Sequence, residues 1–395
     1  MVEITEEELV NLDNLADGLS EVRKYKSKPE KGKNKKSESL QKENPSDKGK
    51  LKGGVVAIFI FSLAVFLSVA GYVTIVYGNI PFVVKWRNIW IETAMTTDQH
   101  KWLATAFFPD RLIDEVMSGQ MKSGEIYVTD VYGVKSTDVL GQSHLKEGEK
   151  DKFGNEVLVN NQSESIVILK VKKSTFEGKL VLVDDPSRVT LSVTDYKNSR
   201  GEFVCDYLER DNGIVGINAS GFIDKGGTSL GGLITGQCVS GGEYWGSYSP
   251  EFTLLGFDEN DRLVVGGTEN WKDYNIRDGI QFHPTLIVDG EKVVKDSAGW
   301  GLQPRTVVGQ CRNGVVLFFV VDGRQPGYSL GATMEDCADV LLQYGAISAA
   351  ACDGGSSSVM AYDGEIINKP STDMPTGRYL PNAWIVERKT PADNE

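Results

Sequence analysis

Two hydrophobic patterns divide this chain. Residues 53–84 contain no charged side chain, and their centre, Val55–Tyr77, is almost wholly apolar. From about Glu125 onward, short apolar runs rich in β-branched residues alternate with turns that contain glycine, as is typical of β-strands. The two patterns together predict a membrane-spanning segment followed by a sheet-rich domain.

Few segments of the second region show helical spacing. Phe203–Arg210 is a short candidate, whereas Thr333–Tyr344 has a capping threonine, acidic residues in its first turn and a glycine after its last residue, as helices prefer. Strands dominate, so we expect an α+β fold. The predicted strands are Ile166–Val171, Gly178–Val183, Arg188–Val193, Gly213–Ile217, Thr253–Phe257, Arg262–Val265, Thr285–Val288, Arg305–Gly309, Val315–Val321 and Ile347–Cys352.

The apolar segment, placed at residues 53–78, is long enough to cross a bilayer. At about 1.5 Å per residue, Val55–Tyr77 covers roughly 34 Å. A lysine-rich block precedes it and only a lightly basic flank follows, so the positive-inside rule places the N-terminus in the cytoplasm and the remainder outside. A cleaved signal peptide is the alternative, because Ser68-Val69-Ala70 resembles a cleavage site. A charged region of about fifty residues is too long for a signal peptide. We therefore predict a single-pass anchor in the plasma membrane with the C-terminal bulk extracellular.

Composition divides the rest of the chain. Residues 1–52 are polar and lysine-rich and are predicted to be a disordered cytoplasmic tail. Residues 79–121 are predicted to form a helical stalk, because apolar residues recur there at helical spacing. Its tryptophans are expected either to pack within the stalk or to face the membrane surface, where tryptophan is enriched. Residues 125–388 are predicted to be the main domain.

Charge argues against a nucleic-acid-binding function, and the cysteine spacing argues against a cysteine-ligated metal site. The chain has a net charge of −13 with its lysines concentrated before the anchor, so the main domain is acidic and nucleic acid is not an expected partner. The five cysteines show no metal-type spacing, and few or no disulfides are expected. His283 is interpreted as a hydrogen-bonding residue of the interior or surface, because no second histidine lies downstream of residue 150 to complete a metal site.

Polar residues follow two of the predicted strands. Asp322 comes directly after Val315–Val321, and Asp353 comes directly after Ile347–Cys352, with Gly354-Gly355 and three serines behind it. A predicted helix separates the strands. If the strands are parallel, both carboxylates emerge at one edge of the sheet. Glycines allow backbone amides to approach a ligand closely, which suits a phosphorylated or polyoxygenated molecule.

Further polar residues stand at strand ends. Asn218 ends Gly213–Ile217, Arg305 begins a strand and Arg324 lies two residues after Asp322. Guanidinium groups match phosphate in bidentate geometry, so both arginines are candidates for phosphate binding. Each assignment has a structural alternative, because Asp-Gly pairs and asparagines are also ordinary turn residues.

These residues lie in blocks that together resemble the phosphodiester glycosidase domain family, over roughly residues 125–388. The anchor and stalk resemble the membrane-tethered bacterial members, which are often described as exopolysaccharide-related. Two positions depart from the family pattern: Ile223 replaces a frequent second aromatic residue, and Ser356 stands in place of a third glycine. The blocks are Ile217-Asn218-Ala219-Ser220-Gly221-Phe222, Gln303-Pro304-Arg305-Thr306-Val307-Val308-Gly309, Val321-Asp322-Gly323-Arg324, Cys352-Asp353-Gly354-Gly355-Ser356-Ser357-Ser358 and Asn368-Lys369-Pro370-Ser371.

The resemblance implies hydrolysis of a sugar-1-phosphodiester, or of a glycopolymer with such links, to a free sugar and a phosphomonoester. Attack at the anomeric carbon or at phosphorus gives the same products, and the sequence leaves both open. No cofactor is certain; a calcium or magnesium ion beside the two aspartates is left open, with no defined ligand set. The implied site consists of Asp353 and Asp322 as acid, base or nucleophile, Arg305 and Arg324 on the phosphodiester, and Asn218, Gly354, Gly355, Ser356, Ser357 and Asn368 around the sugar and phosphate oxygens.

Two other functions fit the sequence. The domain would alternatively be a non-catalytic cell-envelope module that binds glycan or an anionic polymer. For a hydrolase, teichoic-acid-like polymers or capsule linkages of a Gram-positive envelope are substrates consistent with the outward topology. The chain would otherwise be a tethered protein that binds a partner through Trp86–Met121. Substitution of Asp353 by Asn separates these functions from hydrolysis, since only an enzyme requires that carboxylate.

Overall fold

The computed structural model describes residues 53–97, 100–118, 126–129, 144–224, 229–267 and 271–390. The chain divides into two compact units, Met1–Val65 and Phe66–Glu395. The predicted tail at 1–52, the end of the predicted stalk at 121 and the start of the predicted domain at 125 lie outside the described residues.

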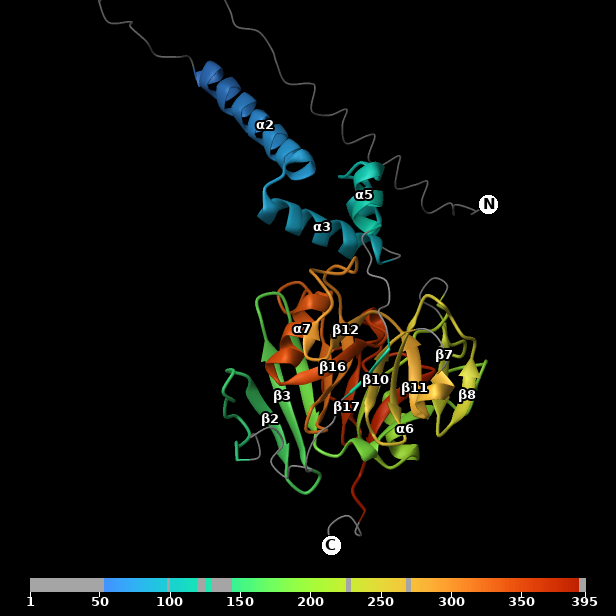
Figure 1. Ribbon diagram of the computed structural model, residues 1–395. Helices are drawn as coiled ribbons and strands as arrows, with labels where there is room; N and C mark the ends of the chain where they lie inside the picture. The colour runs from blue at the N-terminus through green and yellow to red at the C-terminus, as the bar shows by residue number, and fades with distance from the viewer. Residues whose placement is uncertain are drawn as a thin grey trace, which may run out of the picture. The chain divides into compact units, whose positions relative to one another are not determined.

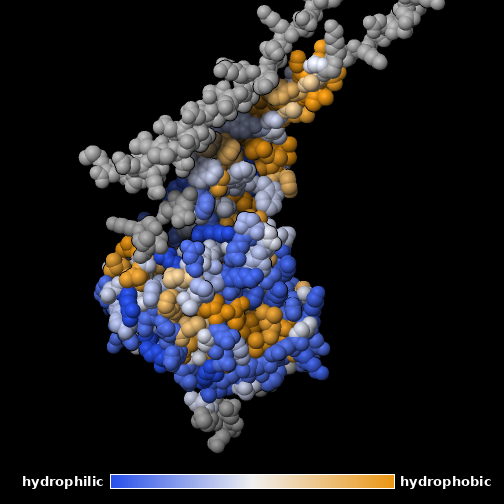
Figure 2. Space-filling view, turned by 180° about the vertical axis from the view of Figure 1, so that it is seen from behind, coloured by the Kyte–Doolittle hydropathy of each residue, from blue (hydrophilic) through white to orange (hydrophobic). Residues whose placement is uncertain are grey.

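A long apolar helix begins the described chain. Helix α2 spans Gly53–Tyr77, and its part Gly54–Tyr77 is long and apolar enough to cross a membrane, with its most apolar stretch not buried inside the protein. Figure 2 shows hydrophobic surface on the helical N-terminal segments and a mainly hydrophilic surface on the sheet-rich body, which also carries an apolar area near its middle. The predicted apolar helix is therefore present.

Three further helices follow, where a helical stalk was predicted. Helix α3 (Pro81–Met95) starts with proline, whose fixed backbone angle suits a first helical position. Helices α4 (Trp102–Thr105) and α5 (Asp110–Met117) come next. Their apolar side chains share a small core with the end of α2, made of Val76, Ile91, Ala94, Ala104, Phe108, Ile113 and Val116.

The described strands of the body form three sheets in which neighbouring strands run antiparallel (Figure 1). The eight-stranded sheet has the order β13 (Glu291–Lys292), β12 (Thr285–Val288), β16 (Ala346–Ala351), β14 (Arg305–Cys311), β15 (Val316–Val321), β4 (Glu177–Val183), β3 (Ile166–Lys172) and β2 (Glu156–Asn161). The six-stranded sheet has the order β1 (Tyr127–Val128), β10 (Leu263–Gly266), β9 (Thr253–Asp258), β11 (Ile276–Phe282), β7 (Gln237–Ser240) and β8 (Glu243–Gly246). The five-stranded sheet has the order β18 (Glu365–Ile366), β17 (Met360–Tyr362), β6 (Gly213–Asn218), β19 (Asn382–Glu387) and β5 (Val189–Val193).

Helices are few in the body, which confirms the predicted α+β class. Helix α6 (Val204–Arg210) packs on the five-stranded sheet and α7 (Met334–Gln343) packs on the eight-stranded one. Short 3-10 turns occur at Pro186–Arg188, Trp271–Tyr274 and Gly355–Ser357.

The strands that carry the two candidate aspartates run in the same direction but are not neighbours. Both β15 and β16 pair antiparallel with β14, which lies between them. The two strands are thus parallel to each other, as the sequence analysis required, although β14 separates them. The C-terminal ends of β15 and β16 and the N-terminal end of β14 meet at one edge, which brings Asp322, Asp353 and Arg305 to the same side of the sheet.

The central strands β15 and β16 of the eight-stranded sheet are buried on both faces, which explains why they are continuous apolar runs. In β4, Leu180 and Leu182 point into the core shared with α7, while Val181 and Val183 point into the core shared with the other two sheets. Successive side chains of a strand alternate between faces, so each strand contributes to both cores. This packing holds the edge that carries the candidate residues.

Helix α7 owes its first turn to a reciprocal cap. The Thr333 hydroxyl accepts a hydrogen bond from the Asp336 amide at 3.0 Å, and the Asp336 carboxylate accepts one from the Thr333 amide at 2.9 Å. We expect Thr333→Ala to lower the free energy of unfolding by about 1 kcal/mol, because the cap of a helix is lost. Urea unfolding of the purified protein measures this, with Thr376→Ala at an exposed position as the control. Equal stability of the two variants would contradict the prediction.

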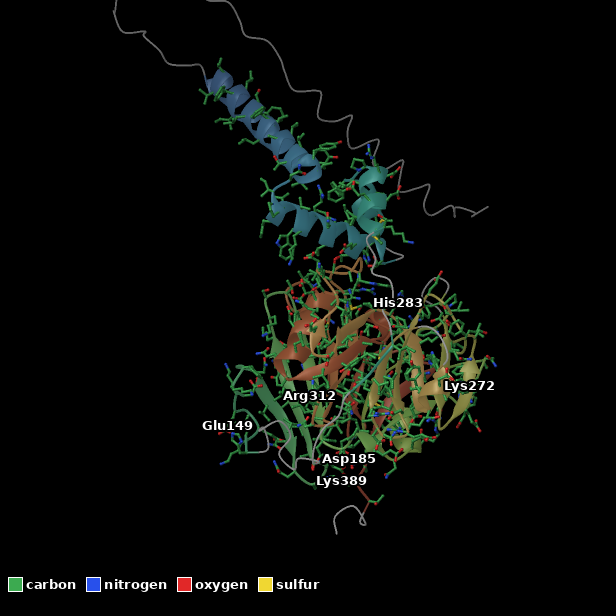
Figure 3. All side chains as sticks on the ribbon, viewed as in Figure 1. Glu149, Asp185, Lys272, His283, Arg312 and Lys389 are labelled. Carbon is green, nitrogen blue, oxygen red and sulfur yellow. The ribbon has the colours of Figure 1, made fainter. Side chains whose placement is uncertain are left out.

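Four of the cysteines and His283 lie in the interior of the body. All five cysteines are free, and Cys238, Cys311, Cys337 and Cys352 are buried. His283, labelled near the upper end of the body in Figure 3, packs between the rings of Phe252 and Trp300, each with its centre 4.8 Å away. Burial lowers the pKa of His283 to about 4, so the ring is neutral at physiological pH.

Candidate active site

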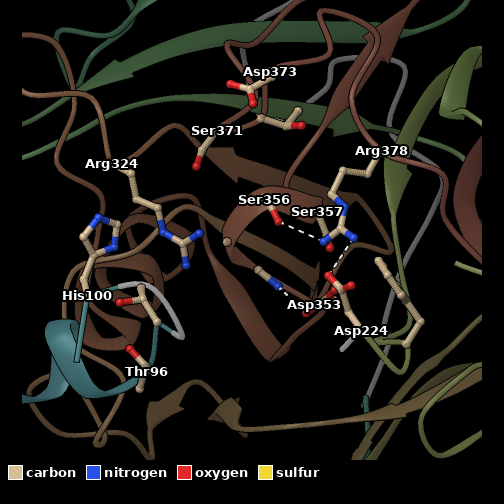
Figure 4. Close-up of a pocket in the computed structure, with 15 residues that line it drawn as sticks. Thr96, His100, Asp224, Arg324, Asp353, Ser356, Ser357, Ser371, Asp373 and Arg378 are labelled. Atoms are coloured by element: carbon tan, nitrogen blue, oxygen red, sulfur yellow. Dashed lines mark hydrogen bonds and ion pairs between the residues drawn. The ribbon is translucent and has the colours of Figure 1, made fainter. Parts of the chain in front are cut away.

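A cavity of about 750 Å³ lies at the sheet edge where β16 ends. Figure 4 shows Arg324 and Arg378 pointing toward each other across it, with Ser356 between them and Asp353 and Asp224 on one side. The loop after β16, the turn after β15 and the connection between α3 and α4 all contribute to its wall. The lining residues are Thr96, Thr97, His100, Phe222, Asp224, Arg324, Asp353, Gly354, Gly355, Ser356, Ser357, Ser371, Thr372, Asp373 and Arg378.

Asp353 is the carboxylate that the β16 edge presents to the cavity. Its amide donates to the Ala219 carbonyl at 2.9 Å, and its Oδ1 accepts from the Gly354 amide at 3.0 Å. Burial raises the pKa of Asp353 to about 6, although hydrogen bonds from Ser357 and Gly354 and the charges of Arg378 and Arg324 act in the opposite direction. The group therefore changes protonation state in the range where enzymes use general acids and bases.

Two guanidinium groups face this carboxylate. Arg324 is exposed in the cavity and is held by its Nε, which donates to the Gln303 side chain at 2.7 Å. Its backbone lies in the left-handed region, with φ of 58°, a conformation of higher energy that is often found at functional sites. Arg378 forms an ion pair with Asp224 at 2.6 Å and donates to the Ser356 hydroxyl at 3.1 Å. Together they make the cavity suited to an anion.

The glycine pair explains how Arg324 reaches the cavity. Gly355 has φ of +63°, and a side-chain carbon added there would lie 2.9 Å from the Arg324 guanidinium. A carbon added at Gly354 would lie 2.9 Å from the Pro304 carbonyl oxygen. The glycines thus let the loop after β16 lie directly against the arginine.

Asn218 holds the loop of Asp353 from beneath. Its Nδ2 donates to the Asp353 carbonyl at 2.7 Å, and its Oδ1 accepts from the Thr306 hydroxyl at 2.6 Å and from the Val359 amide at 3.2 Å. The side chain is fully buried and does not line the cavity. The structure therefore brings Asn218 to Asp353 in a position to orient it.

Asp322 lies behind the cavity wall, only 1% exposed. Its Oδ1 accepts from the Asn368 side chain at 3.0 Å and from the Lys369 amide at 2.9 Å, and its Oδ2 accepts from the Tyr328 hydroxyl at 2.8 Å. The same hydroxyl also lies 3.0 Å from the Glu177 carboxylate. Burial raises the pKa of Asp322. Both oxygens are engaged, so Asp322 is placed to hold the chain around Asn368 and Lys369.

Arg305 is also withdrawn from the cavity. It is 3% exposed, its Nε donates to the Ala332 carbonyl at 3.0 Å, and an NH2 group donates to the carbonyls of Trp300 and Gly301 at 3.0 and 2.8 Å. Burial lowers the pKa of Arg305 to about 10. Its donors tie together the backbone around the site, whereas Arg378 takes the place beside Asp353 that the sequence reasoning gave to Arg305.

The remaining predicted residues divide in the same way. Ser356 and Ser357 line the cavity with Gly354 and Gly355. Asn368 does not line it, because its amide group is engaged by Asp322 and its Oδ1 accepts from the Met360 amide at 2.8 Å. Sequence reasoning missed Arg378 and Asp224. Asp224 stands two residues beyond the Asn218–Phe222 block, and this closeness could have identified it as a candidate. No motif near Arg378 in the sequence indicates a role for that residue.

Among the described residues, no group of three or more histidine, cysteine, aspartate or glutamate side chains is arranged to hold a metal ion. Of the carboxylates that line the cavity, Asp224 forms an ion pair with Arg378. The expectation of a calcium or magnesium ion therefore stays untested.

Residues 211–387 match the family model described as phosphodiester glycosidase. This segment of the chain is similar to the phosphodiester glycosidase domain. The predicted resemblance is thus confirmed for a segment that includes Asp353, Arg324 and Arg378. The matched segment begins at Asp211, whereas the sequence prediction began at 125, so the first strands of the body lie outside the match.

Similar proteins give further comparisons. An uncharacterised SPbeta prophage-derived protein of Bacillus subtilis, YomE, is 28% identical over 219 residues, which are 52% of this chain and 34% of that protein. The chain therefore spans about a third of the length of this relative. The zebrafish N-acetylglucosamine-1-phosphodiester α-N-acetylglucosaminidase catalytic domain, auto-inhibited by its pro-peptide, is 19% identical with a TM-score of 0.47, over 57% of this chain and 82% of that one. A putative exported protein of Burkholderia pseudomallei is 16% identical with a TM-score of 0.42, over 54% of this chain and 74% of that one.

Proposed function

We propose that this protein is a membrane-anchored hydrolase that cleaves a sugar-1-phosphodiester to a free sugar and a phosphomonoester. The observation that carries the proposal is the placement of Asp353, with its raised pKa, in a cavity with Arg324 and Arg378. The match of residues 211–387 to the phosphodiester glycosidase family supports the same reaction class. The site faces the cell exterior, where it acts on envelope glycans or polymers; the apolar helix α2 and the lysine-rich block before it support this topology.

The two arginines bind the phosphodiester in this mechanism. Guanidinium groups accommodate two phosphate oxygens at once, and their charge stabilises the negative charge that develops on the departing phosphate. Arg378 is held in place by Asp224, and Arg324 by Gln303. A phosphate stabilised in this way leaves without a separate proton donor.

Asp353 acts as the general base. As a carboxylate it removes a proton from the attacking water, while Asn218 and the Ala219 carbonyl fix the backbone from which it projects. Asp322, Arg305 and Asn368 support this arrangement from behind the wall. The Ser356 and Ser357 hydroxyls contact oxygens of the sugar or phosphate.

The assay uses the full chain in phosphatidylcholine vesicles with methyl α-N-acetylglucosamine 1-phosphate as the substrate, and measures the free sugar. Release by the native protein, and none by Asp353→Asn, supports the proposal. Binding of the ester without release by either protein, with and without calcium or magnesium, would favour a glycan-binding module instead.

The pH dependence tests the role of Asp353. Because the carboxylate is the active form and its pKa is about 6, kcat/KM should rise from pH 4 to pH 7 with a midpoint near that value. Arg378→Met should move the midpoint upward, since the positive charge of Arg378 lowers this pKa. A rate that falls above pH 6 would instead make Asp353 a proton donor.

A further inference from the structure

A second, apolar groove adjoins the proposed active site. It has a volume of about 550 Å³, and Thr97, His100 and Arg324 line both the groove and the catalytic cavity. Trp86 and Trp90 of α3 form one wall, and Leu330, from the turn after β15, lies on another. A groove of this size and character is typical of sites for small apolar ligands.

The wall made by α3 is held firmly against the body. The Leu302 amide donates to the Thr93 hydroxyl at 2.8 Å, and the Gln303 side chain donates to the Thr93 carbonyl at 3.0 Å. A side-chain carbon on Gly301 would lie 2.3 Å from the Thr93 amide nitrogen, so glycine is needed for this close approach. The other end of the Gln303 side chain accepts from Arg324 at 2.7 Å. One residue therefore supports both the groove wall and the phosphate-binding arginine.

The position of the groove in the chain indicates where its occupant comes from. Only residues 78–80 separate α2, which ends at Tyr77, from α3, which begins at Pro81. A chain anchored through α2 therefore keeps α3 near the bilayer surface. Trp86 and Trp90 are 43% and 47% exposed, and tryptophan is enriched at membrane interfaces. Along the chain, these two groove residues are nearer to α2 than any residue that lines the catalytic cavity.

We propose that the substrate is a lipid-linked sugar, in which the anomeric phosphate is esterified to a long-chain alcohol. The hydrocarbon chain occupies the groove, the phosphate lies between Arg324 and Arg378, and the sugar lies beside Asp353. This substrate assignment rests on the proposed function. It adds the identity of the alcohol that is esterified to the phosphate. The groove is apolar at one end and meets the Arg324 guanidinium at the other. An amphiphile with a hydrocarbon chain followed by a phosphate matches this arrangement.

The reaction balances with water alone. Water gives its hydroxyl group to the anomeric carbon, and the bond from that carbon to the phosphate oxygen breaks with its electron pair on the phosphate. Asp353 takes the remaining proton of the water. The products are the free sugar and a long-chain alkyl monophosphate that returns to the membrane.

The test compares methyl, butyl and octyl esters of α-N-acetylglucosamine 1-phosphate as substrates of the full chain in phosphatidylcholine vesicles. Each methylene that leaves water contributes about a threefold to fourfold gain, so burial of four should raise kcat/KM about 100-fold from methyl to octyl. The groove variant is Trp86→Gln with Leu330→Gln. The control is Trp102→Gln with Val293→Gln, two exposed residues that do not line the groove.

We expect the ratio of kcat/KM for the octyl ester to that for the methyl ester to be high in the native protein and in the control. In the groove variant this ratio should fall toward one. A ratio near one in the native protein, with the methyl ester turned over, overturns the lipid substrate and leaves the hydrolase intact. If no ester is cleaved, the proposed function fails, and calorimetric titration decides the groove separately. In that titration, the heat measured with protein-free vesicles is subtracted. If octyl phosphate then binds the native protein no more tightly than butyl phosphate, the lipid site is overturned and an apolar protein segment is favoured as the occupant of the groove.

Discussion

Replacing Asp353 with asparagine should lower kcat about 1,000-fold while leaving substrate binding within a few fold of the native value. Loss of a general base costs about 10²–10⁴ in rate. Asparagine has the same shape, and its oxygen can still accept from the Gly354 amide, which lies 3.0 Å from the Asp353 carboxylate. The arginines that bind phosphate are unchanged. Initial rates of sugar release, measured over a range of substrate concentrations, separate kcat from KM.

The matched control is Asp363→Asn, which removes a carboxylate from the surface, where it pairs with Arg388 and is 63% exposed. This variant should keep the native rate. An Asp353→Asn protein that retains more than a tenth of native kcat would remove Asp353 from the mechanism.

The same substitution should make the protein more stable at pH 7. The pKa of Asp353 is raised to about 6 by burial, so the folded state loses stability relative to the unfolded chain as pH rises from about 4 through 6. Asparagine has no charge to bury, so it removes this loss of unfolding free energy, which amounts to at most about 3 kcal/mol. The difference in unfolding free energy between native and variant should therefore be present at pH 7 and vanish near pH 4.

Replacing Arg305 with methionine should destabilise the fold by about 3–5 kcal/mol. The carbonyls of Ala332, Trp300 and Gly301 all accept hydrogen bonds from this buried guanidinium, and methionine removes all three of these bonds. A buried polar group left without its partner costs about 1–3 kcal/mol. Urea unfolding followed by tryptophan fluorescence measures the loss.

Arg324→Met is the comparison, because Arg324 is exposed in the cavity and its Nε makes a single hydrogen bond, to Gln303. It should change the unfolding free energy by less than about 1 kcal/mol while reducing kcat/KM by about 10²–10³ through loss of charge stabilisation. An Arg305→Met protein as stable as the native one would return Arg305 to the residues that bind phosphate.

Local patterns predicted much of the framework. The alternation in β4 and the apolar run of β15 were visible as strands because both faces of these two strands are buried. The pattern was less informative for β11, whose strand includes the charged residues Arg277 and Asp278. Asp278 is 4% exposed and pairs with Arg277, so a residue that indicates a loop in the sequence lies inside a sheet.

The sequence by itself determined the apolar helix, the α+β class and the loop of Asp353, because each depends on residues that are close together in the chain. Only the tertiary structure decided which side chains share the cavity. Inserting β14 between β15 and β16 buries Arg305 among backbone carbonyls, and Asp322 is enclosed by Tyr328 and Asn368. Arg378 reaches Ser356 from 22 residues along the chain. Residue type and spacing report a side chain's chemistry and the face of its own strand, whereas sheet order and loop packing decide whether it meets a ligand or the protein's own backbone.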